Sequence, residues 1–139
     1  MSDMQTLLID SATRIFDDLS TPEVRNASEK GEWQGAIWQA LEETGLTLAS
    51  IPEASGGSGA DLDDGLMLIR LVGRYAAPIP LADTFLASQA LLDAGLSSQS
   101  GVYGFSIASG ISAQQSEIAI TLDGEIAAVP FARHLSRFI

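Results

Sequence analysis

Apolar residues recur at the three- and four-residue spacing of an amphipathic helix through most of the chain, and this periodicity constrains the fold more than any single motif. It is present in residues 3–19, 32–44, 61–75 and 80–94. In the first segment the stripe consists of Met4, Leu8, Ala12, Ile15 and Leu19, flanked by Leu7 and Phe16. In the third it consists of Leu62, Leu66, Ile69, Val72 and Tyr75, which we expect to be buried. We therefore predict a bundle of helices packed through these stripes.

The ends of the expected helices carry residues that favour those positions. Gly45 and Gly95 follow the second and fourth helices, where glycine readily adopts the left-handed conformation of a C-terminal cap. Asp61 can cap the third helix, and Pro80 suits the first position of the fourth. The fourth helix is apolar around most of its circumference, so we expect it to be buried on several sides. Residues 20–31 are polar and contain a proline, which we expect to break the helical pattern.

Towards the C-terminus the pattern changes to strict alternation, which predicts β-strands. Residues 103–107 and 118–122 both alternate. The dipeptide Asp123-Gly124 follows the second of them and predicts a hairpin turn. The strand after that turn would begin at Glu125.

These patterns together predict a mainly α chain. We expect a helical bundle in residues 1–97 and an incomplete antiparallel β segment in residues 98–139. A few short strands leave their own edges uncovered, so we expect this segment to be the start of a larger sheet. A longer polypeptide, another subunit or a swapped copy of the same chain would complete it.

The charge balance excludes two classes of partner. The net charge is −11, and Lys30 is the only lysine. Nucleic acids and anionic membranes repel such a surface.

The chain has no cysteine, which excludes disulfides and thiolate chemistry. No apolar run approaches the length of a membrane span, and residues 1–20 lack the features of a signal peptide, so we expect a cytoplasmic protein.

The stretch IPEASGGSGADLDDG, residues 51–65, has the glycines of a phosphate-binding loop without its other features. A dinucleotide fingerprint needs a third glycine and a preceding strand, and a P-loop needs Gly-Lys followed by Ser or Thr. Residues 61–72 resemble the start of a calcium loop. Their glycine falls one place early, and Val72 stands where the terminal glutamate belongs. Capping of the following helix explains these acidic residues better.

The remaining candidates for chemistry do not form a catalytic site. His134 is the only histidine, so the usual zinc sites and catalytic triads cannot be assembled, and we expect it on the surface beside two arginines. Trp33 and Trp38 are expected to anchor the core or an interface. Glu42 and Glu43 are neighbours in sequence and do not face each other on a helix, so they do not form an acid–base pair. The sequence therefore predicts no catalytic residue and no metal ligand.

The order of features over residues 4–96 resembles the N-terminal helical domain of acyl-CoA dehydrogenases. In that family a helix ends in Glu-x-Gly, a Pro-Glu-x-x-Gly-Gly-x-Gly turn follows, and a further helix leads into an alanine-rich segment. The residues that match are Leu41, Glu42, Gly45, Leu46, Ile51, Pro52, Glu53, Gly56, Gly57 and Gly59. The stretch Ala-Pro-Ile-Pro at 77–80 is similar to a divergent branch of the family. The resemblance is weaker over residues 97–139, which are similar to the start of the middle β-domain of that branch.

The resemblance implies a flavin-dependent dehydrogenation of an acyl-CoA thioester. The family removes a proton alpha to the thioester and transfers a hydride from the beta carbon to FAD. Its N-terminal bundle supplies one wall of the acyl pocket, which implies substrate-binding roles for Leu81, Ala82, Phe85, Leu86 and Gln89; ordinary core positions are the alternative for each of them. Pro52, Gly56, Gly57 and Gly59 are expected to form a rigid turn, with a generic glycine–serine loop as the alternative.

Some features of the family are missing. GVYGFSIASG stands in the region of a Thr-Glu-Pro segment, and AAVPFARHL replaces Lys-x-Trp-Ile-Thr. The family's catalytic glutamate belongs to a C-terminal helical domain that has no counterpart here. No flavin-binding residue is therefore assigned, and we expect the chain to be inactive alone. We expect it to belong to a homo- or hetero-oligomer or to a longer chain. The alternatives are a non-catalytic helical partner subunit of a heteromeric complex and a truncated remnant.

Overall fold

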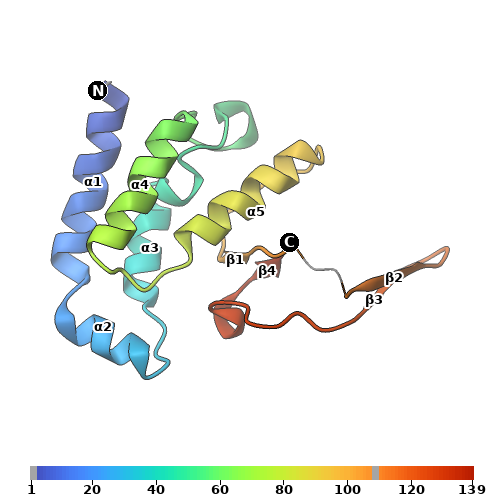
Figure 1. The fold of residues 1–139 in the computed structure, drawn as a ribbon. Helices are drawn as coiled ribbons and strands as arrows, with labels where there is room; N and C mark the ends of the chain where they lie inside the picture. Colours follow the sequence, from blue (N-terminus) through green and yellow to red (C-terminus); the bar gives the residue numbers. More distant parts are fainter. Residues whose placement is uncertain (1–2, 108–109) are drawn as a thin grey trace.

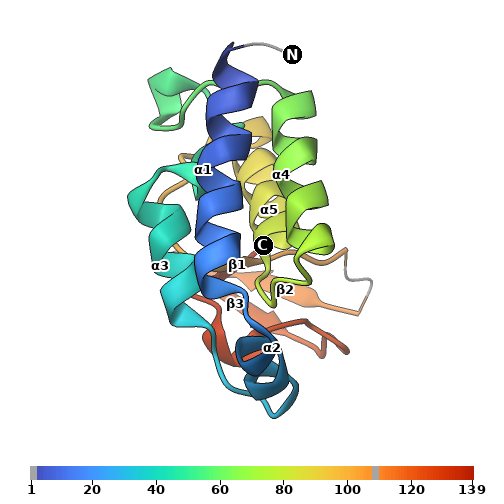
Figure 2. The same cartoon turned by 90° about the vertical axis from the view of Figure 1, so that its left-hand side faces the viewer.

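The structure is a computed structural model that describes residues 3–107 and 110–139. It is mainly helical, as predicted, with the helices packed together and the strands on one side of them (Figure 1). The described helices are α1 (Asp3–Leu19), α2 (Pro22–Glu29), α3 (Gly35–Glu43), α4 (Leu62–Arg74) and α5 (Leu81–Asp93). Figure 2 shows α1 lying between α3 and α4, and α1 contacts both. None of the helices in the described part of the chain combines the length and apolarity needed to cross a bilayer.

The helix α1 packs through Leu8, Ala12 and Phe16, which are its buried residues. Residues 20–31 interrupt the first helix as expected, since α1 ends at Leu19, but they also contain α2, which the sequence did not predict. Thr21 caps α2, with its Oγ1 accepting from the main-chain N–H of Val24 at 3.3 Å. The sequence of α2, PEVRNASE, is mostly polar and carries no apolar stripe by which periodicity could identify it, and none of its residues is buried.

The helix α3 begins at Gly35 rather than Glu32 and buries Ile37, Trp38 and Leu41. Its end is as predicted. Gly45 adopts a left-handed conformation with φ +73° directly after the helix.

The helix α4 begins as predicted, with the Asp61 side chain accepting from the main-chain N–H of Asp64 at 2.9 Å. The predicted buried stripe was wrong at its first two positions, whereas Ile69, Val72 and Tyr75 are half-buried against the core. Leu62 is 72% exposed and Leu66 is also exposed, whereas Leu68 and Leu71 are buried. Both buried leucines belong to the core cluster that includes residues of α1. Apolar residues lie on two faces of α4, and periodicity alone does not say which face the neighbouring helix covers.

The helix α5 packs against α4, the turn Leu46–Leu48 and β1, as expected for a helix buried on several sides. One strip of it, with Ala82, Leu86 and Gln89, is exposed. Two polar residues, Thr84 and Ser88, are buried instead. Their hydroxyl groups have partners in the segment that follows the helix, which makes their burial tolerable.

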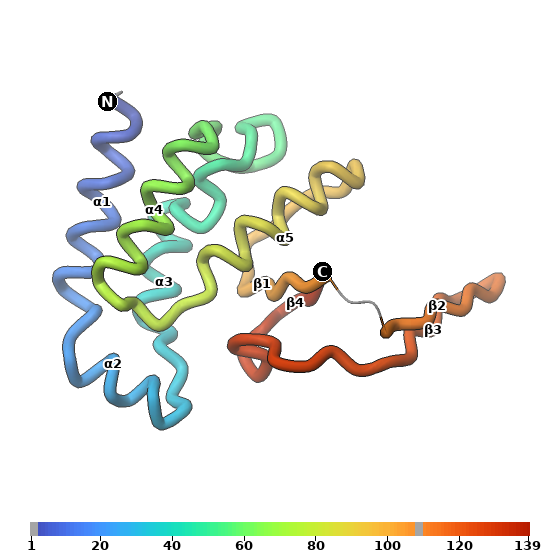
Figure 3. Tube along the Cα trace, in the orientation of Figure 1, coloured from blue at the N-terminus to red at the C-terminus, as the bar shows by residue number. Residues whose placement is uncertain are grey.

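The strands form two separate pairs. β1 (Tyr103–Gly104) pairs in parallel with β4 (Arg137–Phe138), and β2 (Ser112–Gln115) pairs antiparallel with β3 (Ile120–Asp123). The β2–β3 hairpin projects away from the helices (Figure 3). All residues of β2 and β3 are exposed, so this small sheet has neither a covered face nor covered edges in the structure.

The predicted hairpin turn at Asp123-Gly124 was wrong. Asp123 belongs to β3, whereas a type I′ turn needs a positive φ at both central residues. The turn lies at residues 116–119 instead, where the main-chain N–H of Ser116 donates to the carbonyl of Ala119 at 2.8 Å. Ala108 and Ser109, which belong to the stretch standing in the region of Thr-Glu-Pro, lie outside the described residues.

Candidate functional site

A groove runs between α4 and α5, which lie next to each other in the bundle (Figure 2). It encloses a cavity of about 380 Å³. Its lining consists of Ser50 from the connection after α3, Leu62, Gly65, Leu66 and Ile69 from α4, and Ala82, Phe85, Leu86 and Gln89 from α5. We call this the α4–α5 groove.

Burial divides the lining into a floor and a rim. Gly65 and Phe85 are buried and form the floor together with the half-buried Ser50. Leu62 and Leu66 are exposed on the α4 rim, and Leu86 is 54% exposed on the α5 rim. Large apolar side chains left uncovered around a concavity are typical of a site that receives an apolar ligand or another polypeptide.

The groove brings together four of the five residues that the family resemblance implied. Ala82, Phe85, Leu86 and Gln89 line it. Leu81 lies in the buried core cluster and does not line the groove. Sequence reasoning missed the whole opposite wall, because it assigned Leu62, Leu66 and Ile69 to the buried stripe. The signal was present in the sequence, since α4 carries apolar residues on more of its surface than one neighbouring helix can cover.

The glycine-rich connection holds the floor of the groove in place. It folds back on itself, and the main-chain N–H of Gly59 donates to the Ile51 carbonyl at 2.9 Å while that of Gly57 donates to the Pro52 carbonyl at 3.2 Å. Gly56 has φ +88° and Gly59 has φ +69°, both in the left-handed region that favours glycine. At Gly57 a side chain would overlap the carbonyl of Ile51. This compact turn sets Ser50 against Gly65 of α4.

Hydrogen bonds connect α5 to β1 and to the segment between them. Thr84 Oγ1 donates to the Tyr103 carbonyl at 3.3 Å and accepts from the Tyr103 main-chain N–H at 3.2 Å. Ser98 Oγ donates to Ser88 Oγ at 2.8 Å. These buried bonds fix α5, and with it one wall of the groove, to the segment that leads into the strands.

Of the described residues that line the groove, none is charged. Asp83 lies beside the lining residue Ala82 in the first turn of α5, where burial raises the pKa of its carboxyl group. The only polar side chains of the lining are those of Ser50 and Gln89. The groove can therefore bind and shield an apolar group, but it offers neither a base nor a cation for a phosphate.

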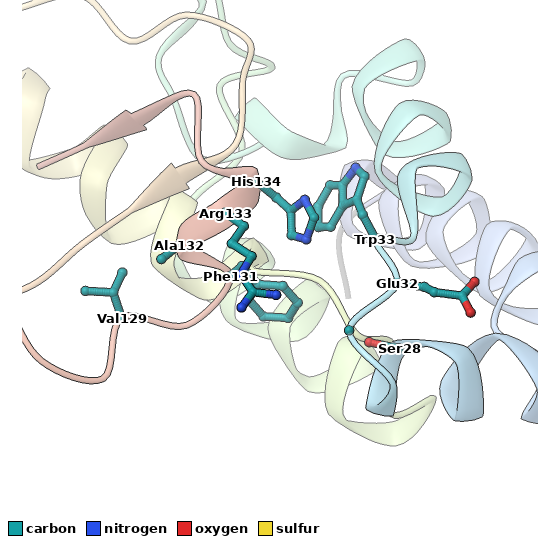
Figure 4. A pocket seen from close by; sticks show the side chains of 9 residues that line it. Ser28, Glu32, Trp33, Val129, Phe131, Ala132, Arg133 and His134 are labelled. Carbon is teal, nitrogen blue, oxygen red and sulfur yellow. The ribbon is translucent and has the colours of Figure 1, made fainter.

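A second hollow, of about 300 Å³, lies between the connection that precedes α3 and the short turn Ala132–His134 (Figure 4). The ring of His134 stacks on Trp33 with centroids 5.0 Å apart, and the rings of Phe131 and Trp33 are T-shaped to each other with centroids 6.2 Å apart. His134 was expected on the surface, but it is half-buried by this stack. Within the described residues, no three acidic or histidine side chains gather into a metal site.

The arrangement of helices, glycine turn and groove agrees with comparison to known sequences. The family model described as "Acyl-CoA dehydrogenase, N-terminal domain" matches residues 2–111, which is most of the chain. The chain belongs to the acyl-CoA dehydrogenase family. The match to the N-terminal domain of this family contains the five described helices and both walls of the α4–α5 groove.

Two curated members of the acyl-CoA dehydrogenase family are similar to the chain, and both are named acyl-CoA dehydrogenase IpdE2. The protein from Mycolicibacterium smegmatis (strain ATCC 700084 / mc(2)155) is 32% identical over 98 residues, which cover 68% of this chain and 32% of that protein. The protein from Mycobacterium tuberculosis (strain ATCC 25618 / H37Rv) is 39% identical over 69 residues, covering 49% of this chain and 21% of that protein. The matched region thus spans about a third or less of each relative. No solved structure matches the chain significantly.

Proposed function

We propose that this chain is the N-terminal part of an FAD-dependent acyl-CoA dehydrogenase and that the α4–α5 groove forms one wall of its acyl pocket. The observation that carries the proposal is the uncovered apolar groove within the region that matches the family. An acyl chain is uncharged and apolar, and it binds most favourably to a lining that is also uncharged and apolar. Leu66 and Leu86 on the rim and Phe85 on the floor would contact it.

The proposed role of the groove is to bind the acyl chain and to exclude water from it. Dehydrogenation also requires a carboxylate base that removes the proton alpha to the thioester, and FAD, which accepts the hydride from the beta carbon. The lining of the groove contains no carboxylate for the first task. It also contains no basic side chain for the pyrophosphate of FAD, so these residues do not fit the cofactor. We therefore assign both tasks to the polypeptide that completes the enzyme, and we expect no turnover from this chain alone.

One observation favours a second candidate function, a non-catalytic helical subunit in a heteromeric complex of the family. The β2–β3 hairpin presents Ile118 and Ile120 to solvent, and both edges of its small sheet are unpaired. Such edges commonly pair with another chain. The two candidates share the groove and differ in whether the catalytic residues follow on the same polypeptide.

For either candidate we propose residues 1–97 and 98–139 as the two domain segments, and a cytoplasmic location.

The proposal predicts that a charge on the groove rim weakens acyl-CoA binding, whereas the same charge elsewhere does not. Leu86 lines the groove and is 54% exposed, and Leu96 lies outside it and is 58% exposed. We expect Leu86→Asp to raise the Kd for octanoyl-CoA at least about tenfold, because a carboxylate would be desolvated by the acyl chain. Leu96→Asp should leave the Kd unchanged. Isothermal titration of the purified protein measures both values, and equal losses in the two variants would contradict the proposed wall.

A further inference from the structure

We propose that Gly65 determines how deeply an acyl chain enters the α4–α5 groove. The inference rests on the proposed function and adds the residue that limits the length of the chain accepted. Gly65 is the floor residue contributed by α4, and it lies between the other two floor residues, Ser50 and Phe85.

The corner of the groove floor beside this glycine is bounded by two side chains. A Cβ atom added at Gly65 would lie 3.3 Å from both Cβ and Oγ of Ser50 and 3.5 Å from Cε2 of Phe85. All three residues line the cavity. A methyl group at Gly65 would therefore occupy the point on the floor where the three residues converge, and the tip of a bound chain could not reach it.

The backbone does not require a glycine at this position. Gly65 lies inside α4 and is not among the glycines with positive φ. Glycine is the least favourable helix residue apart from proline, so a helical backbone alone would favour alanine. The neighbours of the added Cβ are side-chain atoms: the Ser50 hydroxyl can rotate away, whereas Ser50 Cβ, also at 3.3 Å, has to shift by a few tenths of an ångström. At Gly57, in contrast, the obstacle is backbone. The absence of a side chain at Gly65 thus has its effect on the groove floor.

The depth of the groove can be measured directly because the protein contains no cysteine, so a single introduced thiol can be labelled selectively. Leu86→Cys places a single thiol on the groove rim, to which butyl, octyl and dodecyl groups can be attached as disulfides with alkyl methanethiosulfonates. Because the alkyl group is tethered, the groove does not have to bind a free ligand tightly, although it is only one wall of a pocket. A tail that enters the groove buries more apolar surface as it lengthens and raises the Tm.

With Gly65 in place, we expect the octyl adduct to melt about 5 °C above the butyl adduct. In the Gly65→Ala background this difference should fall by about half, since the floor is reached by a shorter tail. Gly73→Ala is the matched control. Gly73 lies on the same helix, is exposed and has nothing within 4 Å of an added Cβ, so the difference should be unchanged. Ser50→Val, which fills the floor from the opposite side, should reproduce the loss and guards against misfolding of the first variant.

The outcomes separate this inference from the proposed function. If the octyl adduct is no more stable than the butyl adduct with Gly65 present, the groove does not take an acyl chain, and both the wall and its depth are overturned. If the octyl adduct is more stable by the same amount with glycine, with Gly65→Ala and with Ser50→Val, the groove takes the chain but Gly65 does not limit it. The second result overturns the present inference alone.

Discussion

Replacing Gly57 by alanine is expected to lower the free energy of unfolding by about 3 kcal/mol, because the added methyl group has no space. Its Cβ would overlap the carbonyl oxygen and approach the side chain of Ile51, which is itself buried. Relieving that overlap requires the turn to open, which breaks the bonds that Gly57 and Gly59 make to residues 51 and 52. Urea unfolding followed by circular dichroism gives the free energy.

Gly56→Ala is the control for this result. Gly56 has φ +88° but nothing within 4 Å of an added Cβ, so only the left-handed backbone is penalised. That penalty is about 1–2 kcal/mol. The larger loss at Gly57 is therefore a specific expectation of a compact turn. Equal losses, or a larger loss at Gly56, would indicate a loose glycine–serine loop instead.

A comparable loss is expected from Leu68→Ala, about 2–5 kcal/mol, because this side chain is 1% exposed within the core cluster. Leu62→Ala, on the same helix, should cost less than about 1 kcal/mol, because Leu62 is largely in water. Thermal and urea unfolding of the two variants measure the difference. The pair tests which face of α4 is turned towards α1.

The reverse order of effects, with Leu62→Ala the more damaging, would restore the stripe that periodicity predicts and would remove the α4 wall from the groove. Similar small effects at both positions would mean that α4 is not packed into the core. Either result would contradict the assigned orientation of the helix.

The helical part could be predicted from the sequence where a strong apolar stripe or a clear cap marks a helix. Residues 3–19 have the stripe and the helix that starts after Asp61 has the cap, and their boundaries agree with α1 and α4 to within one residue. The short helix α2 has a cap at Thr21 but no buried residue, so nothing in the periodicity reveals it. The hairpin register could not be predicted either, because β2 and β3 have no covered face to select one alignment.

The candidate site could be predicted on its α5 side alone. Family resemblance implied Ala82, Phe85, Leu86 and Gln89, whereas the opposite wall depends on how α4 is rotated about its axis. That rotation follows from tertiary packing against α1 and is not encoded in the spacing of the apolar residues of α4. The role of Gly65 depends on the same rotation, since a glycine carries no pattern of its own until its neighbours are known.

The most direct test of the central claim is photoaffinity labelling with an acyl-CoA that carries a diazirine at the end of its acyl chain. If the α4–α5 groove is a wall of the acyl pocket, mass spectrometry should find the label on residues 62–69 and 82–89. Excess octanoyl-CoA should reduce that labelling by competition. Label concentrated elsewhere, such as at the hollow beside Trp33 and His134, would contradict the account.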